Sequence, residues 1–443
     1  MGIAHSHALL PSAAPLRLVK GYAVLAACFV ASAGRAQSRN PPPVMSQDSV
    51  APMAGVSRRA LALYRAAYVV DMHNDLPSRI LDDRYDPDVR HGAGFAGQLG
   101  STDLPRLVES GITAVFLSDF VDARYVWARP DGSYRRAVLM ADAIHSFVAR
   151  HPDRLLFATT AADVRRAKAE GRIAVFIGVE GGHAIENSIE KLRDLHRRGA
   201  RYLTLTWNNG NEWAGSSVGS GGTRTGGLTD LGRQIVREMN RLGVLVDLSH
   251  VSDETFADAL SVSTAPVIAS HSAARAIGNH PRNLTDDQIR ALAQSGGVVN
   301  INFFSRFIDP AQIHAAAEMK RRLDEARDSL RARHPADPHA VSVALEALQA
   351  ALRSRLPRTP LSVLIDHFDH VARVGGVDHV GIGSDFDGVS DLPDGMEDVT
   401  RLPRIAQGLL DRGYSEEDVR KMLGGNMMRV MQQVLDRRAG PDR

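Results

Sequence analysis

From about residue 60 onward, the chain alternates short apolar runs with longer amphipathic stretches. The apolar runs are rich in Val, Ile and Leu, and eight occur in order: Tyr68–Asp71, Ile112–Leu117, Ile173–Gly178, Tyr202–Thr206, Val244–Leu248, Pro266–Ala269, Gly297–Ile301 and His379–Gly383. Continuous apolar runs of this length predict parallel strands that are buried on both faces. The stretches between them have helical spacing, as at Ile189, Leu192 and Leu195.

Eight strands that alternate with helices predict an α/β protein with a (β/α)8 barrel of the TIM type. A doubly wound open sheet is the alternative, and the number of strands favours the barrel. A longer insertion, at about residues 311–356, separates the seventh strand from the eighth. Its two Ala- and Arg-rich stretches flank a segment with two prolines, which predicts a solvated helical hairpin. A lid or a surface for a partner is the other interpretation of this insertion.

The first 36 residues have the pattern of an export signal. They contain no acidic residue, and basic residues precede an apolar run (residues 22–31) that is too short for a relaxed membrane span. The small residues after this run predict cleavage after Ala36 and therefore a secreted or periplasmic protein. Lipidation of Cys28 is the alternative, and it would anchor the protein to a membrane.

Composition narrows the possible functions. Of the 443 residues, 44% are hydrophobic and 23% charged, which is typical of soluble globular proteins. Without residues 1–36, the 53 Lys and Arg fall to 50 against 51 Asp and Glu, and a formal charge of −1 argues against a nucleic-acid partner. Residues 37–60 lack periodicity and predict a linker, so we expect the domain at 61–438. With a single cysteine, any metal site must use histidine and carboxylate ligands.

Polar side chains cluster where the predicted strands end. The carboxyl ends of the strands form one rim of a parallel barrel, and catalytic groups lie on that rim. The residues at these ends that could bind a metal or move a proton are His73, Asp75, Glu180, His250, His271, Asp385 and Asp387. We therefore expect three histidines and several carboxylates to meet at one place.

These residue types predict a site for two metal ions. His73 and Asp75 are two residues apart, which would place both on one face of an extended strand, and an imidazole beside a carboxylate suits zinc. Glu180 can bridge two cations because a carboxylate has two oxygens, and no lysine lies at a strand end to serve as a carboxylated bridge. His250 and His271 could hold the second ion. The sequence thus predicts two Zn²⁺ per chain and a bridging water acidified to hydroxide.

Five motifs follow one another along the chain: His73-Asn-Asp75-Leu-Pro, Gly178-Val-Glu180-Gly-Gly-His, Leu245-Val-Asp-Leu-Ser-His250-Val, Pro266-Val-Ile-Ala-Ser-His271-Ser and Asp385-Phe-Asp387-Gly388. Together they resemble the renal, or membrane, dipeptidase family over about residues 65–435. The resemblance implies a (β/α)8 barrel with a dinuclear zinc site, usually in a homodimer. It also implies hydrolysis of dipeptides, with a D-residue tolerated at the C-terminal position, and some family members open β-lactam rings.

The resemblance implies a role for each site residue. The five metal ligands would be the same as those that the spacing predicts. Asp385 would take a proton from the bridging water and deliver it to the departing amine. Arg282 would hold the C-terminal carboxylate of the substrate, which its guanidinium fork can bind through two hydrogen bonds.

Two positions depart from the family pattern. Trp207 stands where the family has a histidine that contacts the substrate carbonyl, and an indole N–H can donate a hydrogen bond but cannot carry charge. A neighbour such as Asn208, Asn209 or Asn211 could replace it. Phe304 stands where the family tends to have a tyrosine, so the pocket loses a hydroxyl. We expect both aromatic residues at the substrate pocket, which they would make more apolar.

The sequence and the resemblance together predict an exported zinc dipeptidase, and the resemblance implies that it is a homodimer. A related dinuclear amidohydrolase that acts on N-acyl amino acids, lactones or β-lactams is the alternative, and Trp207 and Phe304 are its support. A binding protein that keeps zinc for structure alone is a third hypothesis. Loss of Asp385 or of a metal ligand would have indicated such a protein, and none of them is lost.

Overall fold

The structure, a computed structural model, describes residues 53–92, 100–128, 131–219, 226–333 and 337–436. The predicted export signal, with Cys28 and Ala36, lies outside the described residues. Among the residues that are described, no helix is both long and apolar enough to cross a membrane. The first helix, α1 (Arg58–Ala66), begins within the last residues of the segment that we predict as a linker.

Eight parallel strands close into a barrel. They are β1 (Val70–Asn74), β2 (Ala114–Phe120), β4 (Ile173–Glu180), β5 (Ala200–Thr204), β6 (Leu245–Asp247), β7 (Ile268–Ser272), β8 (Val298–Ile301) and β9 (Val380–Ile382). Pairing runs from each strand to the next, β2 pairs with β4, and β9 closes the ring on β1. Each strand coincides with one of the eight apolar runs. The predicted (β/α)8 barrel is confirmed, and the open sheet is excluded because the ring is closed.

A ninth strand, β3 (Leu155–Phe157), lies outside the barrel. It pairs with the first residues of β4, where Leu155 is in register with Ile173. Three residues are too few to show a period, which is why the hydrophobic pattern does not predict this strand.

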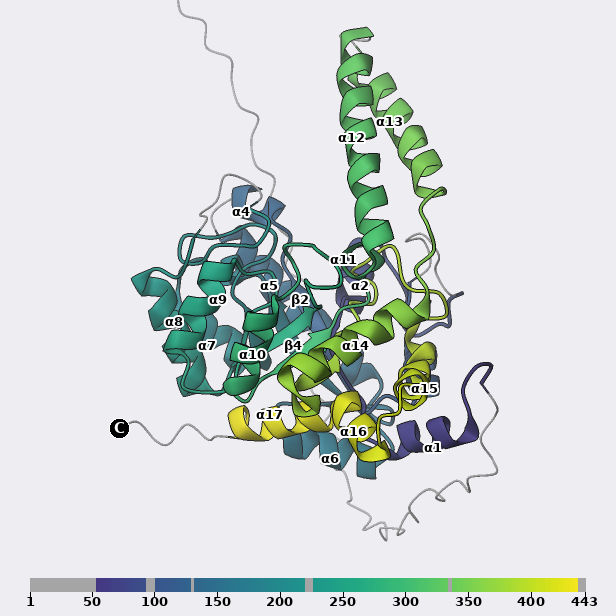
Figure 1. The fold of residues 1–443 in the computed structure, drawn as a ribbon. Coiled ribbons are helices and arrows are strands. Elements are labelled where there is room, and N and C mark those ends of the chain that lie inside the picture. Colours follow the sequence, from purple (N-terminus) through teal and green to yellow (C-terminus); the bar gives the residue numbers. More distant parts are fainter. Residues whose placement is uncertain (1–52, 93–99, 129–130, 220–225, 334–336, 437–443) are drawn as a thin grey trace, which may run out of the picture. The chain divides into compact units, whose positions relative to one another are not determined.

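Helices surround the barrel (Figure 1). They are α2 (Leu76–Asp82), α3 (Leu104–Ser110), α4 (Arg124–Ala128), α5 (Gly132–Arg150), α6 (Ala161–Ala169), α7 (Ile189–Arg197), α8 (Asp230–Leu242), α9 (Asp253–Val262), α10 (Asp286–Gln294), α14 (Leu361–Gly375), α15 (Pro403–Asp411), α16 (Glu416–Arg420) and α17 (Asn426–Val434). Thr160 and Thr285 begin α6 and α10 with capping boxes, in which side chain and backbone satisfy each other's hydrogen bonds. The buried face of α8, with Ile235 and Met239, packs in the core outside the strands.

The amino end of the barrel interior is filled with apolar side chains. Phe116 and Phe176 stack there with ring centroids 4.5 Å apart, and Met72 is wholly buried in the same cluster. Methionines of α17, including Met427 and Met431, belong to this cluster and cover that end. Polar chemistry is therefore left to the carboxyl end of the barrel.

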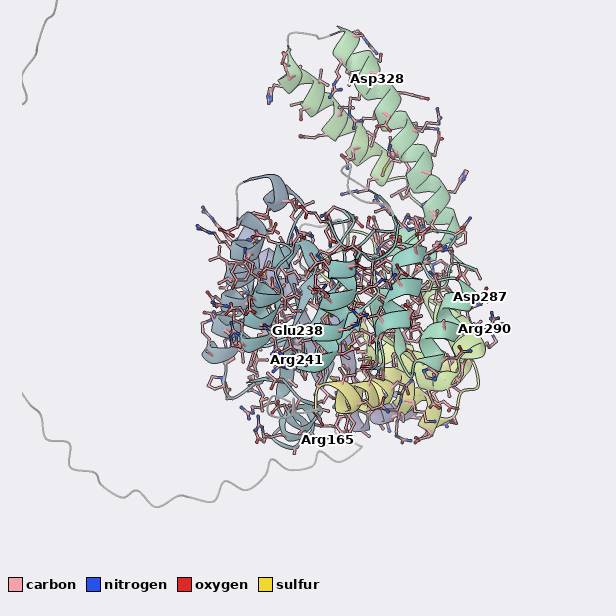
Figure 2. All side chains as sticks on the ribbon, turned by 90° about the vertical axis from the view of Figure 1, so that its left-hand side faces the viewer. Arg165, Glu238, Arg241, Asp287, Arg290 and Asp328 are labelled. Carbon is pink, nitrogen blue, oxygen red and sulfur yellow. The ribbon has the colours of Figure 1, made fainter. Side chains whose placement is uncertain are left out.

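The insertion between β8 and β9 is a helical hairpin, as the sequence predicts. The short α11 (Ser305–Ile308) leads into α12 (Pro310–Arg333) and α13 (Pro338–Arg353), which project from the barrel (Figures 1 and 2). Of the side chains described in α12 and α13, only Gln312, Met319 and Val341 are buried. Ion pairs between residues three or four apart run along α12. The hairpin is thus mainly solvated.

Candidate metal centre and substrate pocket

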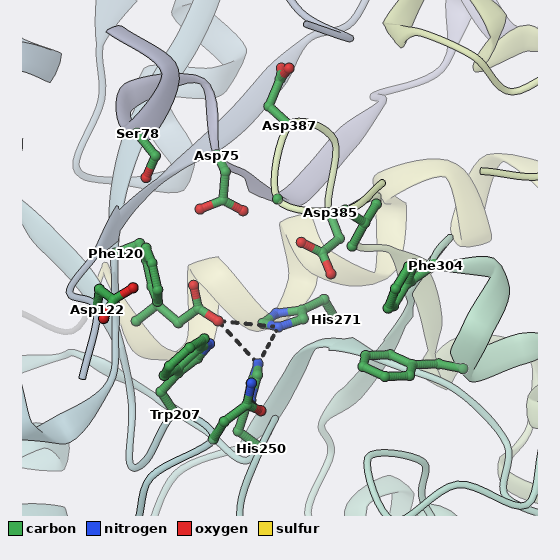
Figure 3. A pocket seen from close by; sticks show the side chains of 15 residues that line it. Asp75, Ser78, Phe120, Asp122, Trp207, His250, His271, Phe304, Asp385 and Asp387 are labelled. Carbon is green, nitrogen blue, oxygen red and sulfur yellow. Dashed lines mark hydrogen bonds and ion pairs between the residues drawn. The ribbon is translucent and has the colours of Figure 1, made fainter. Parts of the chain in front are cut away.

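The residues that the sequence assigns to metal binding and proton transfer lie together at the carboxyl end of the barrel (Figure 3). All six are buried, and they are His73 and Asp75 from β1 and the residue after it, Glu180 at the end of β4, His250 after β6, His271 in β7, and Asp385 after β9. Five strands, far apart in sequence, therefore contribute to one cluster.

Two of these residues have a left-handed backbone. His250 has a φ of 69° and Asp385 a φ of 62°. For a residue other than glycine this conformation costs on the order of 1–3 kcal/mol, and it persists only where the surrounding structure imposes it. Here the backbone N–H of Asp385 donates to the carbonyl of His73 at 3.0 Å, and the carbonyl of His250 accepts from Ser217 at 2.7 Å. The strained turns fix the direction of both side chains.

His73 and Asp75 lie side by side at the end of β1. The strand ends at Asn74, and Asp75 stands at the N-cap position of α2, with φ −94° and ψ 21°. Its Oδ2 nevertheless lies 3.2 Å from Nε2 of His73. The two side chains therefore meet as their spacing predicts, although the strand itself ends one residue before Asp75.

Glu180 turns its two oxygens to different histidines. Its Oε2 lies 3.4 Å from Nε2 of His73, and its Oε1 lies 3.0 Å from Nε2 of His250 and 3.6 Å from Nε2 of His271. The dashed lines in Figure 3 mark the contacts on the His250 and His271 side. Ser118 donates to Oε2 at 3.3 Å. A carboxylate that divides its oxygens in this way has the geometry that a bridge between two cations needs.

Each of the three histidines is held through its Nδ1, so that its Nε2 faces the cluster. The contacts are Tyr202 Oη to His73 Nδ1 at 2.7 Å, Asn208 Oδ1 to His250 Nδ1 at 3.1 Å, and Ser270 Oγ to His271 Nδ1 at 2.8 Å. A histidine that binds a metal usually has its other ring nitrogen bonded in this manner, which fixes the ring and the tautomer.

Sequence reasoning missed the residues that hold the cluster in place. Tyr202 lies wholly buried, and a β-carbon on Gly178 would come within 2.0 Å of its Cζ, so a glycine is needed opposite the ring. Asn302 donates from Nδ2 to Oδ2 of Asp385 at 2.8 Å. The signals that could have found them are a tyrosine inside an apolar run and an asparagine directly after a strand.

Burial sets the charge of the carboxyl groups. Burial raises the pKa of Asp385 to about 8; His73 opposes this rise, and the charges of Asp75 and Glu180 add to it. The pKa of Glu180 lies well below its usual range, because the attraction of the histidines, His73 first, outweighs the effect of burial. Glu180 is therefore ionised, and Asp385 is able to gain and lose a proton near neutral pH.

The histidines divide into two kinds. Burial lowers the pKa of His250 to about 3 and holds the pKa of His271 well below its usual range, so both rings are neutral. The pKa of His73 is raised, since Tyr202 and the facing carboxylates outweigh its burial. Neutral imidazole is the form that binds a metal, so a cation at His73 would replace a proton.

A cavity of about 330 Å³ opens above the cluster (Figure 3). Besides five of the cluster residues, its lining consists of Ser78, Phe120, Asp122, Trp207, Asn208, Phe304, Phe307, Asp387, Gly388 and Val389. Aromatic rings thus form two walls over a floor of histidines and carboxylates.

Trp207 lies on one of these walls. Its ring packs edge-on against Phe120, with centroids 5.0 Å apart and an interplanar angle of 63°. Figure 3 shows the indole nitrogen turned toward His250 and His271. The side chain therefore offers its N–H to the cavity above the floor.

The three asparagines after Trp207 have different positions. Asn208 lines the cavity and holds His250. Asn211 is used within its own loop, where its Nδ2 donates to the carbonyl of Leu205 at 2.9 Å. Asn209 is buried and does not line the cavity. Of the three, Asn208 alone could meet a ligand there.

Arg282 lies behind the cavity wall. It is 3% exposed and does not belong to the lining, and its Nη2 donates to the carbonyl of His271 at 3.2 Å. Its guanidinium carbon is 5.5 Å from the centre of the Phe307 ring. Burial lowers its pKa to about 10, so it stays charged at neutral pH. Its Nε has no hydrogen-bond partner among the described residues.

Known proteins are similar to this chain over most of its length. The family model for membrane dipeptidases (peptidase family M19) matches residues 57–440. The probable dipeptidase PvdM from Pseudomonas aeruginosa is 24% identical with a TM-score of 0.72, and the match covers 86% of this chain and 98% of that one. A metallopeptidase from Rhodobacter sphaeroides, liganded with a phosphinate mimic of the dipeptide L-Ala-D-Ala, is 27% identical with a TM-score of 0.66, covering 83% and 99%.

Proposed function

Because the chain belongs to the membrane dipeptidase family, whose members are metallopeptidases, we propose that it hydrolyses dipeptides with two zinc ions. The ligands would be His73 and Asp75 for one ion, His250 and His271 for the other, and Glu180 between them. The observation that carries this proposal is the division of the two Glu180 oxygens between two sets of histidine nitrogens.

The chemistry of the donor atoms supports zinc. Nitrogens and carboxylate oxygens without a thiolate form common zinc sites, and Nε2 of His73 is buried between carboxylate oxygens of Asp75 at 3.2 Å and Glu180 at 3.4 Å. One ligand atom from each of His73, Glu180 and His271 lies within 4.8 Å of the others, and the same holds for His73, Asp75 and Asp385. When bound, the two ions polarise the scissile carbonyl and acidify water, so that hydroxide forms near neutral pH.

Asp385 is the proposed proton carrier. Asn302 holds its Oδ2, so we assign proton transfer to Oδ1. The carboxylate accepts the proton of the attacking water and returns it to the nitrogen of the departing amino acid.

The substrate is proposed to lie across the cavity with its C-terminal carboxylate toward Arg282. The charge of this guanidinium lies behind His271 and Phe307 and attracts an anion to that end. A D-residue at the C-terminal position is part of the proposal, because the Rhodobacter sphaeroides relative is liganded with a mimic of L-Ala-D-Ala. Export by the N-terminal signal and assembly as a homodimer are further parts of it.

A second candidate is hydrolysis of N-acyl amino acids, lactones or β-lactams. The observation that favours it is that three aromatic side chains of the lining, those of Trp207, Phe304 and Phe307, carry neither a hydroxyl nor a basic group. Such a lining suits a substrate with apolar groups beside the scissile bond.

Amine release from paired substrates tests the proposal. We would load the purified chain with zinc and offer L-Ala-L-Ala, L-Ala-D-Ala and the N-acetylated form of each. The proposal expects cleavage of the free dipeptides, loss of cleavage with a chelator, and two zinc ions per chain by elemental analysis. Cleavage of the N-acetylated compounds alone would overturn it in favour of the second candidate.

A further inference from the structure

The two ends of the cavity differ in charge. At one end Phe304 and Phe307 form the wall, and the guanidinium of Arg282 lies behind it. At the opposite end the lining consists of Phe120, Asp122 and Trp207, from the end of β2 and the loops after β2 and β5 (Figure 3). The cavity is thus positive behind one wall and negative at the other.

Asp122 is the carboxylate that remains for a ligand. Three of the five carboxylates in the lining, those of Asp75, Glu180 and Asp385, belong to the metal centre. The fourth, Asp387, accepts from the backbone N–H of Ser101 at 2.6 Å, and Figure 3 shows its oxygens turned away from the floor. The fifth is Asp122, which neither the metal centre nor the loop at Ser101 uses.

Asp122 is fixed in position by a hydrogen bond to the backbone. Its Oδ1 accepts from the backbone N–H of Arg124 at 2.8 Å, in a turn that sets the side chain's direction. The guanidinium of Arg124 is close enough to interact electrostatically with Asp122, but it does not pair with it: its carbon lies 5.2 Å from the ring centre of Tyr125 and Nη2 lies 4.0 Å from Asp82. In the described part of the chain, no ion pair reaches Asp122. Its second carboxylate oxygen is left for the cavity.

The neighbours of Asp122 strengthen its attraction for a cation. Phe120 and Trp207 line the same end of the cavity, and a charge beside apolar rings interacts more strongly than one in water. The face of an indole ring also attracts an ammonium group. This end of the cavity is therefore suited to a primary ammonium.

The arrangement of a dipeptide matches this polarity. Its ammonium is joined to the attacked carbonyl through a single carbon atom, and its carboxylate lies on the other side of the scissile bond. With the carbonyl over the metal centre and the carboxylate toward Arg282, the ammonium must face the end formed by Phe120, Asp122 and Trp207.

We propose that Asp122 binds the ammonium group of the substrate's N-terminal residue and so restricts the enzyme to peptides with a free N-terminus. This inference rests on the proposed dipeptidase function and deepens it. It also separates that function from the second candidate, because an acylated nitrogen carries no charge for Asp122 to attract.

The test compares two substrates in two forms of the zinc-loaded full chain. L-Ala-L-Ala has the ammonium, and N-propionyl-L-alanine has the same skeleton with hydrogen in its place. In Asp122→Asn an oxygen remains for the Arg124 N–H, so the turn is kept while the charge is lost. We expect Asp122→Asn to lower kcat/KM for the dipeptide roughly 10- to 100-fold, mainly by raising KM. We expect the kcat/KM for N-propionyl-L-alanine to change less than about threefold.

Two further variants make the comparison specific. Asp287→Asn on α10 removes the same charge from a side chain that is 95% exposed and lies on the outer surface (Figure 2). We expect this variant to leave kcat/KM unchanged for both substrates. Asp122→Ser keeps a hydroxyl that can accept from the turn and should repeat the loss if Asp122→Asn fails to fold. Equal losses on both substrates, or a wild-type chain that cleaves both equally well, would overturn the inference.

Binding of an inhibitor separates this inference from the proposed function. If the wild-type chain cleaves neither substrate, the dipeptidase proposal fails on its own. Calorimetry with the phosphinate mimic of L-Ala-D-Ala and its analogue without the amino group then decides the role of Asp122. At least roughly tenfold tighter binding of the amine form, lost in Asp122→Asn, supports the ammonium site, and equal binding of the two forms contradicts it.

Discussion

The floor and the walls of the cavity are built in different ways. On the floor, the metal-directed side chains come from barrel strands or the few residues after them, and buried hydrogen bonds fix each histidine. The walls come from the last residue of β2, from loops and from the four-residue α11, and rings pack on rings, as Phe304 on Phe307 at 4.7 Å. The difference indicates that the barrel fixes the type of reaction, whereas the loops choose the substrate.

The largest effect should follow from a change on the floor that removes the bridge. In Glu180→Gln the amide has one oxygen and no charge, so it cannot join two cations. We expect loss of at least one zinc per chain and a fall in kcat of roughly 10³-fold or more. Elemental analysis and amine release measure the two effects. Glu190→Gln, at a side chain 72% exposed, is the control. A variant with two zinc ions and normal turnover would contradict the bridge.

A second change on the floor should separate turnover from metal binding. Asp385→Asn keeps an oxygen for the Asn302 N–H but cannot carry a proton. We expect both zinc ions to stay and kcat to fall roughly 10²- to 10⁴-fold. Steady-state kinetics beside metal analysis would show this. Retained turnover would remove Asp385 from the mechanism.

A third change affects the floor indirectly, through the tyrosine that holds His73. Tyr202→Phe removes the hydroxyl 2.7 Å from Nδ1 of His73 and leaves the ring that packs against Gly178. We expect zinc affinity to fall roughly 10- to 100-fold, with kcat nearly kept at saturating zinc. Competition with a chelator measures the affinity. Tyr134→Phe, which loses a hydroxyl bonded to Asp194, should bind zinc normally. Equal affinity in both variants would show that the hydroxyl does not hold the ligand.

The smallest effects should come from the walls. Trp207→Phe keeps a ring on Phe120 and removes the N–H that faces the floor, so we expect kcat to fall roughly tenfold or less with zinc content unchanged. Phe304→Tyr restores a hydroxyl and should change KM ratios between substrates by a few fold. Loss of zinc from either variant would contradict the view that only the floor residues determine metal binding.

The same distinction explains what the sequence could predict. Strand ends are visible in the sequence as the places where apolar runs stop. The six floor residues could therefore be predicted from one rule, that the carboxyl ends of the strands of a parallel barrel lie on the same rim. Two details of β1 could not be predicted: the strand ends one residue before Asp75, and its ladder with β2 shifts register between Asp71 and Asn74.

Contacts between distant parts of the chain were also beyond the sequence. Asp71 accepts from the backbone N–H of Ser384 at 2.8 Å across 313 positions, and no local spacing indicates that pair. Arg282 shows a related limit of prediction from sequence. The family resemblance predicts that Arg282 lies near the site, but only its packing against Phe307 shows that it stands behind the wall.

The apolar side chains that fill the amino end of the barrel affect how substrate enters the site and how products leave it. Phe116, Phe176 and Met72 leave no passage along the barrel axis, so the mouth above the floor serves both entry and exit. Each freed amino acid must depart by the route along which the next peptide arrives. Free alanine should therefore compete with Ala-Ala, and the rate in a crowded peptide pool depends on how fast the products clear the mouth.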